Sequence, residues 1–381
     1  MPEFYEFFAG GGMARAGLGD GWVCLFANDF DYKKSRSYRD NWKDEVLSTC
    51  DVRDVTTASI PGQADLVWAS FPCQDLSLAG GGAGLLGERS GTFWPFWNLM
   101  TGLAEEGRAP RIIVLENVCG TLTSHGGKDF TAICEAFHRN GYKCGAVVID
   151  AAMFVPQSRP RLFVIGVRDD ISVPPLLDAS SPTILWHTRA LVNAYESLPS
   201  HVQRNWVWWE IPVPPKRNVI FADLIEDDPE SVPWHTKEET DRLLAMMSPV
   251  NRSKVEAAQK AGRRMVGTIY KRTRRDENGY KIQRAEVRFD DVAGCLRTPA
   301  GGSSRQLIMV VDGDAVGSRL ISSRETARLM GLPDEYRLPG NYNEAYHLTG
   351  DGVVVPVVRY LTVHLIERIL REQGLGTREA A

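Results

Sequence analysis

Long apolar runs are missing from this sequence of 381 residues. None approaches the roughly 20 residues that a membrane-spanning helix needs. The first residues, MPEFYEFFAGGG, also lack the basic region and the cleavage site of a secretory signal. We therefore expect a protein that has no membrane partner and stays in the cytoplasm.

Cysteine is scarce and irregularly spaced. The sequence has seven cysteines, no C-x-x-C pair, and no histidine and cysteine cluster at zinc spacing. This pattern excludes a secreted disulfide framework and gives no reason to expect a metal. We expect all seven thiols to be reduced: Cys24, Cys50, Cys73, Cys119, Cys134, Cys144 and Cys295.

An overall excess of positive charge is also missing, because the formal net charge is −4. The charge is unevenly distributed, however. Residues 251–306 hold 14 Lys and Arg against 6 Asp and Glu, a net charge of +8. A basic segment on an acidic protein is typical either of a surface that faces phosphates or of a solvated loop.

The first 170 residues do contain a clear pattern, in which short apolar runs alternate with helical stretches. Helices are predicted over 91–107 and 129–141. Near-continuous apolar strands separated by helices indicate an α/β fold with a parallel sheet covered on both faces. The predicted strands are 3–9, 22–28, 64–71, 111–118, 144–151 and 161–167.

The alternation breaks at 169–183, a stretch rich in proline and serine that is typical of a linker or domain edge. The tryptophan-rich stretch 205–210 is interpreted as the core of a second, smaller domain. Regular patterns return near Arg319. We therefore predict a nucleotide-binding domain that is interrupted by a smaller domain.

A glycine-rich turn follows the first predicted strand in FFAGGGMARAGLG, residues 7–19. Glycines allow a ligand to approach the backbone closely, and the helix that follows offers free N–H groups. The dinucleotide pattern G-x-G-x-x-G is not met, because Arg15 stands at the third glycine position. Asp29 ends the second strand, where an acid can bind ribose hydroxyls. The loop and the acid together favour an adenosine-containing ligand.

Further candidate residues lie near the ends of the predicted strands, and α/β sheets bind ligands beyond the carboxyl ends of their strands. Cys73 follows the strand 64–71, and Glu116 ends the strand 111–118. Arg159 and Arg161 are two residues apart, so we expect them on one strand with their side chains on the same face. Each has an ordinary explanation: a buried thiol, a capping turn and two surface arginines. Their coincidence at one edge of the sheet favours a nucleophile with a carboxyl and a guanidinium partner.

In order and spacing these motifs resemble the DNA (cytosine-5)-methyltransferase family, over nearly the whole chain outside its middle. FPCQDLS (71–77), ENV (116–118) and QSRPR (157–161) carry the resemblance most strongly. The remaining matches are FAGGG (8–12), ANDFD (27–31), CDV (50–52), RSGTFW (89–94), RLISSRETARLMGLPD (319–334) and GDGVVVPV (350–357). The sequence departs from the family pattern at Met13, Asp29, Asp351 and Gly352, all on the cofactor side.

The resemblance implies a Rossmann-like methyltransferase sheet and a covalent mechanism on cytosine. The Cys73 thiolate would add to C6, Glu116 would bond N3 and the exocyclic amine, and Arg161, with Arg159 beside it, would bond O2. The target base must leave the duplex stack. A glycine-rich loop at 77–91 would close over it.

The resemblance also implies S-adenosyl-L-methionine as cofactor. Phe30 would stack on adenine and Asp51 would accept a hydrogen bond from its amino group. The full set of implied cofactor residues is Phe8, Ala9, Gly10, Gly12, Met13, Asp29, Phe30, Asp51, Val52, Pro72, Phe93, Asp351 and Val353.

The implied partner is double-stranded DNA, bound by a monomer, with a cognate restriction endonuclease as a further partner. Residues 1–172 with 345–381 would form the catalytic domain, and 173–344 the target-recognition domain. The protein would then work in the nucleoid of a prokaryote or of a phage-infected cell. The implied DNA-binding residues are Gln74, Ser77, Arg272, Arg274, Arg275, Arg297, Gly301, Gly302, Ser303 and Arg305.

Three other functions are compatible with parts of this pattern. An RNA cytosine-5 methyltransferase would share the motif order, although a target region of well over 100 residues favours DNA. A non-catalytic DNA-binding regulator would not need to keep Cys73, Glu116 and Arg161. An NAD-linked oxidoreductase is disfavoured by the missing third glycine and by the PCQ and ENV motifs.

Overall fold

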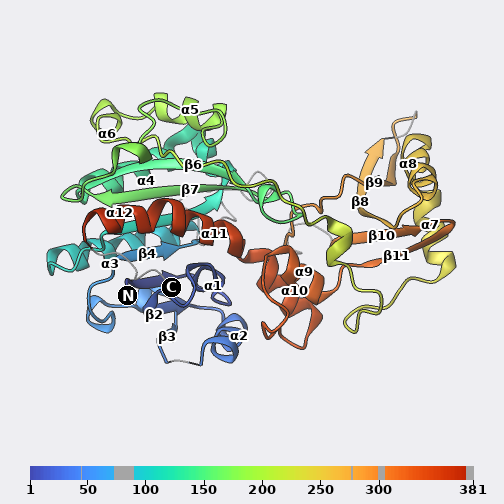
Figure 1. Ribbon diagram of the computed structural model, residues 1–381, viewed down its shortest axis with the longest axis horizontal. Coiled ribbons are helices and arrows are strands. Elements are labelled where there is room, and N and C mark those ends of the chain that lie inside the picture. Colours follow the sequence, from blue (N-terminus) through green and yellow to red (C-terminus); the bar gives the residue numbers. More distant parts are fainter. Residues whose placement is uncertain (44, 73–89, 276–277, 299–304, 375–381) are drawn as a thin grey trace. The chain divides into compact units, whose positions relative to one another are not determined.

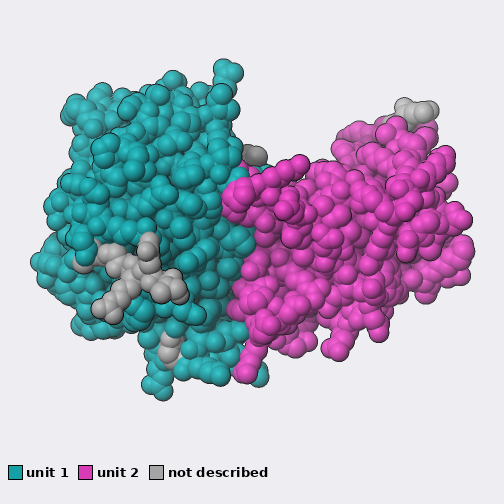
Figure 2. Space-filling model, in the orientation of Figure 1, with its two compact units in different colours: residues 1–150, 160–214, 353–381 teal, residues 151–159, 215–352 magenta. Residues whose placement is uncertain are grey.

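The computed structural model describes residues 1–43, 45–72, 90–275, 278–298 and 305–374. The chain divides into two compact units, coloured separately in Figure 2. Unit 1 comprises residues 1–150, 160–214 and 353–381, and unit 2 comprises 151–159 and 215–352. No helix within these described ranges is long and apolar enough to cross a bilayer.

Unit 1 is built on a seven-stranded sheet in the order β3-β2-β1-β4-β5-β7-β6 (Figure 1). The strands β3, β2, β1, β4 and β5 run parallel, as predicted, whereas β7 runs antiparallel to both β5 and β6. Only nine residues, 151–159, connect β6 to β7, too few for the crossover that parallel strands need. The strands are β1 (Glu3–Phe7), β2 (Val23–Asp29), β3 (Leu47–Thr49), β4 (Leu66–Ala69), β5 (Ile112–Val118), β6 (Tyr142–Asp150) and β7 (Pro160–Arg168).

Helices cover both faces of this sheet, and the alternation along β1 shows how. Tyr5 and Phe7 enter a core shared with α3 and α4, while Glu6 accepts a hydrogen bond from the backbone of Arg15 in α1. On that second face, a Cβ at Gly17 of α1 would lie 2.4 Å from the Cβ of Val358 in α11, so only glycine allows this approach. The helices are α1 (Met13–Leu18), α2 (Tyr32–Trp42), α3 (Phe93–Glu105), α4 (Lys128–Arg139), α5 (Arg189–Glu196), α6 (Ser200–Gln203), α11 (Val355–Leu361) and α12 (Glu367–Glu372).

Residues 173–214 pack on unit 1, so the predicted boundary after residue 172 differs from the observed division. Trp206 and Trp208 lie in the core of unit 1. Trp209 is fully buried and donates a hydrogen bond to the carbonyl oxygen of Ile165 in β7, at 3.3 Å. The interpretation of this stretch as the core of the smaller domain was therefore wrong, because its tryptophans cover the β6–β7 side of the large sheet.

Unit 2 contains an antiparallel sheet of four strands in the order β11-β10-β8-β9. Apolar side chains from α7 and α8 form a core with this sheet. Residues 345–352, predicted to belong to the catalytic domain, lie in unit 2, where residues 345–351 complete α10 and Gly352 follows its last turn. The elements are α7 (Lys237–Ala245), α8 (Pro249–Lys260), β8 (Met265–Arg275), β9 (Lys281–Arg288), β10 (Leu307–Asp312), β11 (Ala315–Leu320), α9 (Ser323–Leu329) and α10 (Tyr342–Asp351).

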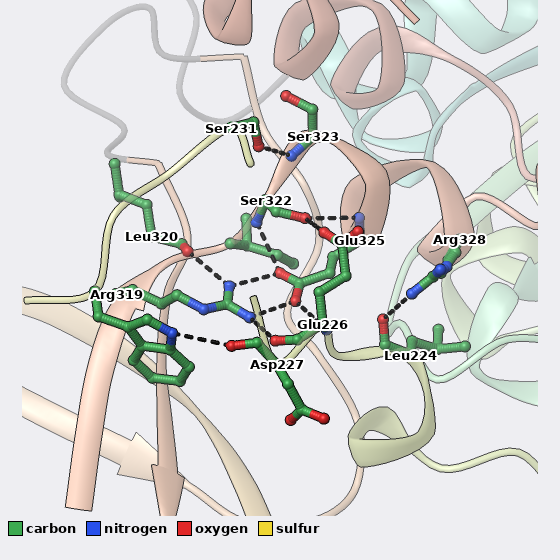
Figure 3. A network of polar contacts seen from close by, with 12 residues as sticks. Leu224, Glu226, Asp227, Ser231, Arg319, Leu320, Ser322, Ser323, Glu325 and Arg328 are labelled. Atoms are coloured by element: carbon green, nitrogen blue, oxygen red, sulfur yellow. Dashed lines mark hydrogen bonds and ion pairs between the residues drawn. The ribbon is translucent and has the colours of Figure 1, made fainter. Parts of the chain in front are cut away.

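A buried ion pair joins β11 to α9 in unit 2 (Figure 3). The guanidinium of Arg319 donates to both carboxylate oxygens of Glu325, at 2.5 and 2.8 Å, and both side chains are fully buried. The same guanidinium donates to the carbonyl oxygens of Leu320 and Glu226, at 3.0 and 2.7 Å. Glu325 also accepts the backbone N–H of Ser322 and so caps α9. The stretch 319–334 therefore holds separate segments of unit 2 together.

Candidate active site and nucleic-acid interface

The loop after β1 has a strained backbone. Phe8 adopts a left-handed conformation with φ of 58°, which is unusual for a bulky residue. Gly10 and Gly12 follow with φ of 56° and 76°, values that favour glycine. A Cβ at Gly12 would lie 2.1 Å from Nε1 of Trp42, whereas a Cβ at Gly10 would meet nothing within 4 Å. The loop is therefore packed on one side and open at Gly10.

Asp29 ties this loop to the end of β2. Its Oδ2 accepts the N–H of Gly10 at 2.7 Å, and its Oδ1 accepts the N–H of Asp31 at 2.8 Å. Burial raises the pKa of Asp29, and the charge of Lys34 and these two N–H groups oppose that rise. The backbone of Ala9 adds a second tie, donating to the carbonyl oxygen of Asn28 at 2.9 Å. The predicted acid thus lies directly against the predicted glycine loop.

The aromatic residues predicted for the cofactor side lie in opposite surroundings. Phe30 is 68% exposed, an unusual position for a large apolar side chain. Phe93 is fully buried, and its ring stacks on that of Trp97 with centroids 5.6 Å apart. Phe30 can therefore meet a ligand directly, whereas Phe93 belongs to the core beneath.

Among the other predicted cofactor residues of unit 1, Asp51 and Val52 follow the end of β3 and Pro72 follows the end of β4. Asp51 begins a short 3-10 turn, where its Oδ1 accepts the N–H of Arg53 at 2.9 Å. Val52, Met13 and Val353 are buried, and Pro72 is half-buried. Asp351 belongs to unit 2, where its carboxylate accepts a hydrogen bond from the hydroxyl of Thr298.

Glu116 and Arg161 form an ion pair between neighbouring strands. Glu116 lies in β5 and Arg161 near the start of β7, and the antiparallel register places Arg161 opposite Val118. The Nε of Arg161 lies 3.1 Å from Oε1 of Glu116, and the side chains are 16% and 8% exposed. The sheet thus brings the predicted carboxyl and one predicted guanidinium together at the end of β5.

Asn117 was not singled out from the sequence, although it stands within ENV. Its amide Nδ2 donates to the carbonyl oxygen of Phe71 at 3.1 Å, and its Oδ1 accepts the N–H of Val118 at 2.8 Å. Asn117 therefore fixes the backbone that leads from β4 toward position 73. Cys73 itself lies outside the described residues, as do Gln74, Ser77 and nearly all of the predicted closing loop 77–91.

The sequence pattern predicted that Arg159 lies on one strand with Arg161. The structure differs, because β7 begins at Pro160. Its guanidinium is buried within unit 2 and donates to the carbonyl oxygens of Leu296, Gly350 and Gly352, at 2.9, 2.9 and 2.8 Å. A guanidinium bonded to three backbone carbonyls acts as a structural clamp. The expectation that Arg159 shares a face with Arg161 was therefore wrong.

Gln157 makes a similar clamp, which the sequence reasoning missed. Its Nε2 donates to the carbonyl oxygen of Leu329 at 2.9 Å, and its Oε1 accepts the N–H of Leu296 at 3.1 Å. The spacing in QSRPR was the available signal, but the partners are more than 100 residues away. Gln157 and Arg159 together hold the segment that leads into the predicted DNA-binding loop.

The predicted DNA-binding arginines lie on two elements of unit 2. Arg272, Arg274 and Arg275 are exposed near the end of β8, and Arg297 is exposed one residue before the end of the described segment 278–298. Arg305 is half-buried, with its guanidinium 5.8 Å from the centre of the Tyr342 ring. The other predicted residues of this loop, Gly301, Gly302 and Ser303, lie outside the described residues.

Comparison with known proteins agrees with this arrangement. The model of the family described as C-5 cytosine-specific DNA methylase matches residues 3–367. The Type II methyltransferase M.BsuFI of Bacillus subtilis is 25% identical over 371 residues, covering 96% of this chain and 73% of that protein. The Type II methyltransferase M.HpaII of Haemophilus parainfluenzae is 24% identical over 390 residues, covering 96% and 89%.

A solved structure gives the corresponding likeness in fold. The S. pombe Dnmt2 methyltransferase superimposes with a TM-score of 0.58 at 16% identity, covering 98% of this chain and 99% of that one. This likeness confirms the predicted α/β fold of Rossmann-like methyltransferases.

Proposed function

The chain belongs to the C-5 cytosine-specific DNA methylase family, and from this premise we propose the details of its reaction. It methylates C5 of a cytosine that is flipped out of double-stranded DNA, within one specific short sequence. The methyl donor is S-adenosyl-L-methionine, and the intermediate is a covalent bond between Cys73 and C6. The observation that supports this most directly is the Glu116–Arg161 pair at the end of β5.

The proposed chemistry assigns one role to each side chain. The Cys73 thiolate adds to C6, and the electron pair of the C5–C6 bond then becomes available at C5. Glu116 bonds N3 and the exocyclic amine and holds the proton that stabilises this adduct. Arg161 bonds O2 and orients Glu116 through their ion pair. After methyl transfer, a base removes the C5 proton and Cys73 leaves as a thiolate.

The residues around the glycine loop fit the proposed cofactor. Open space beside Gly10 leaves room for a ligand against the backbone, and exposed Phe30 offers a face for adenine stacking. In this proposal the Asp29 carboxylate, which also holds the loop, binds the ribose hydroxyls, and Asp51 accepts a hydrogen bond from the adenine amino group. When bound, S-adenosyl-L-methionine supplies a methyl group activated by its sulfonium charge. Phe8, Ala9, Gly12, Met13, Val52, Pro72, Phe93, Asp351 and Val353 complete the proposed surroundings.

Double-stranded DNA is the proposed partner, bound by a monomer through the arginines of unit 2. Arg159 now enters this proposal as a positioning residue, because its guanidinium holds the backbone at Leu296. We propose that the protein works in the nucleoid of a prokaryote or phage-infected cell, beside a restriction endonuclease that cuts the same sequence.

Bisulfite sequencing of plasmid DNA tests this proposal. The plasmid is prepared from cells without other cytosine-5 methyltransferases that express this chain, its Cys73→Ala variant or its Glu116→Gln variant. We expect protected cytosines in one short sequence context with the unaltered chain only. Unprotected DNA in all three samples, with folded protein present, would overturn the proposed function.

A further inference from the structure

The β8–β9 hairpin of unit 2 extends as a two-stranded ribbon beyond its sheet (Figure 1). β10 pairs with β8 only over Met265–Ile269, whereas β9 pairs with β8 from Thr268 to Arg275. Residues 270–275 and 281–286 therefore have each other as their strand partners, apart from an isolated bridge between Ala285 and Met247. A two-stranded β-ribbon has dimensions that fit the major groove of B-form DNA.

The two faces of this ribbon differ. Tyr270, Arg272 and Arg274 alternate onto one face, where Glu286, Arg284 and Ile282 lie opposite them in that order. On the other face, Ile269, Ala285 and Val287 enter the core formed with α7 and α8. The first face, which we call the arginine face (Tyr270, Arg272, Arg274, Arg284 and Glu286), is therefore turned away from these helices.

The arginine face continues onto the base of the predicted DNA-binding loop. A Cβ at Gly294 would lie 2.1 Å from the hydroxyl oxygen of Tyr270 and 3.2 Å from Oε1 of Gln306. The segments that lead into and out of residues 299–304 thus pass directly against Tyr270. The ribbon and the two described segments that flank residues 299–304, which carry Arg297 and Arg305, therefore share one side of unit 2.

Glu286 is the exception on this basic side, because it places a carboxylate between two guanidiniums. One of its oxygens lies 3.1 Å from Nε of Arg272, and the other accepts from Nε and Nη2 of Arg274 at 2.8 and 2.5 Å. The Arg272 guanidinium also lies over the Tyr270 ring, 5.5 Å from its centre. Glu286 is 29% exposed and the two arginines about half exposed, so the ion pairs stabilise the fold little.

The carboxylate has a cost and a benefit on a surface that meets DNA. It repels phosphates, and therefore weakens binding that does not depend on sequence. It also fixes two guanidinium forks side by side, and a fixed fork can bond the O6 and N7 atoms of guanine in the major groove. Both effects increase the difference in binding affinity between the correct sequence and all other sequences.

From this geometry we propose that the arginine face enters the major groove and reads base edges, and that Glu286 is a specificity-determining residue. The inference rests on the proposed function, since it concerns the DNA of that same reaction. Glu286 lowers the affinity for unrelated DNA while it orients Arg272 and Arg274 toward the target sequence.

The test compares the full-length Glu286→Gln variant with a matched charge change. Asp241→Asn removes one negative charge from α7, where Asp241 pairs with exposed Lys237 on a helix that packs under the other face. Methyl transfer is measured on two unmethylated duplexes. One carries the sequence that the protein methylates, and the other carries the same sequence with one base pair changed. Binding to an unrelated duplex is measured over a range of salt concentrations.

We expect Glu286→Gln to lower the ratio of kcat/KM between the two duplexes by about tenfold. Its affinity for unrelated DNA should increase. The slope of log affinity against log salt concentration should steepen by about the amount that one additional phosphate contact contributes. Asp241→Asn should leave the ratio unchanged. Equal ratios for the two variants would overturn this inference while leaving the proposed function intact. An unaltered chain that methylates RNA or no nucleic acid would overturn both.

A second pair of variants tests which face of the ribbon meets DNA. Arg272→Ala with Arg274→Ala removes two guanidiniums from the arginine face, and Lys271→Ala with Arg275→Ala removes two charges from the other face. We expect the first pair to lower kcat/KM on the correct sequence and to relax its specificity. The second pair should weaken binding to all duplexes alike, and the reverse pattern would contradict the assignment.

Discussion

Arg161 with Glu116 in unit 1 and Arg319 with Glu325 in unit 2 are both arginine–glutamate ion pairs, but their surroundings differ. The first pair lies near the end of β5, with side chains 16% and 8% exposed. The second is fully buried and joined to backbone groups of Leu320, Glu226 and Ser322. A pair that remains accessible at strand ends can meet a substrate, whereas a pair enclosed by its own chain can only hold segments together.

The largest expected effect concerns the accessible pair. Glu116→Gln keeps the shape of the side chain but removes its charge and its ability to hold a proton on cytosine. We expect kcat for methyl transfer to fall by about 100- to 10,000-fold, with little change in the melting temperature. A variant with near-normal kcat would show that this pair is structural and would remove the distinction between the two pairs.

The enclosed pair should give the opposite result. Arg319→Met leaves the Glu325 carboxylate buried without its guanidinium, and we expect a loss of about 3–5 kcal/mol in the free energy of unfolding. Chemical denaturation measures this loss, and kcat of the protein that remains folded should stay near normal. The double variant Arg319→Met with Glu325→Leu should recover much of the stability. No recovery would indicate that the pair contributes more than mutual neutralisation.

Glu6 extends the comparison to a buried carboxyl whose described hydrogen bond comes from a backbone N–H and not from an arginine guanidinium. Its Oε1 accepts the N–H of Arg15 at 3.4 Å, and within the described part of the chain Oε2 has no hydrogen-bond partner. Burial raises the pKa of Glu6 from 4.5 to about 8. Between these values the unfolded chain carries the charge and the folded chain holds the proton. Stability should therefore fall as pH rises from 4.5 to 8, by about 1.4 kcal/mol per pH unit.

Glu6→Gln has no such titration. Its free energy of unfolding, followed by denaturant titration at several pH values, should lack this downward slope. An unchanged slope in the variant would assign the pH dependence to other groups.

The smallest expected effect concerns Arg159, an arginine bonded to carbonyl oxygens. Lysine cannot reach the carbonyls of Leu296, Gly350 and Gly352 together. We expect Arg159→Lys to raise the KM for DNA by about tenfold and to leave kcat nearly unchanged. A tenfold change corresponds to the loss of about one hydrogen bond made by a charged group. Arg161→Lys is the control and should mainly lower kcat. A fall in kcat alone for Arg159→Lys would support the catalytic role that the sequence first implied.

The sequence was informative wherever a local pattern determines the structure. The strand and helix patterns of the first 170 residues, the glycine loop and Asp29 were predicted because each depends on neighbours in the chain or on one adjacent strand. The motif pointed to both Glu116 and Arg161, but their proximity depends on the antiparallel direction of β7, which places the start of this strand beside the end of β5.

The remaining features depend on contacts that are distant in sequence. Arg159 reaches carbonyls more than 130 residues away, and no local pattern separates a buried clamp from a surface arginine. The stretch 169–183 has the composition of a linker, yet the tryptophans that follow it pack on β6 and β7. The predicted parallel sheet was wrong for β7, because only nine residues connect it to β6 and a parallel crossover needs more.

The most direct test of the account is covalent trapping on DNA that carries 5-fluorocytosine at the methylated position. Fluorine at C5 blocks the final elimination, so the bond between the nucleophile and C6 persists after methyl transfer. We predict a denaturant-resistant protein–DNA complex in the presence of S-adenosyl-L-methionine, with the modified peptide containing Cys73, and no complex with Cys73→Ala. A complex that survives Cys73→Ala, or attachment at another residue, would contradict the central claim that Cys73 carries the reaction.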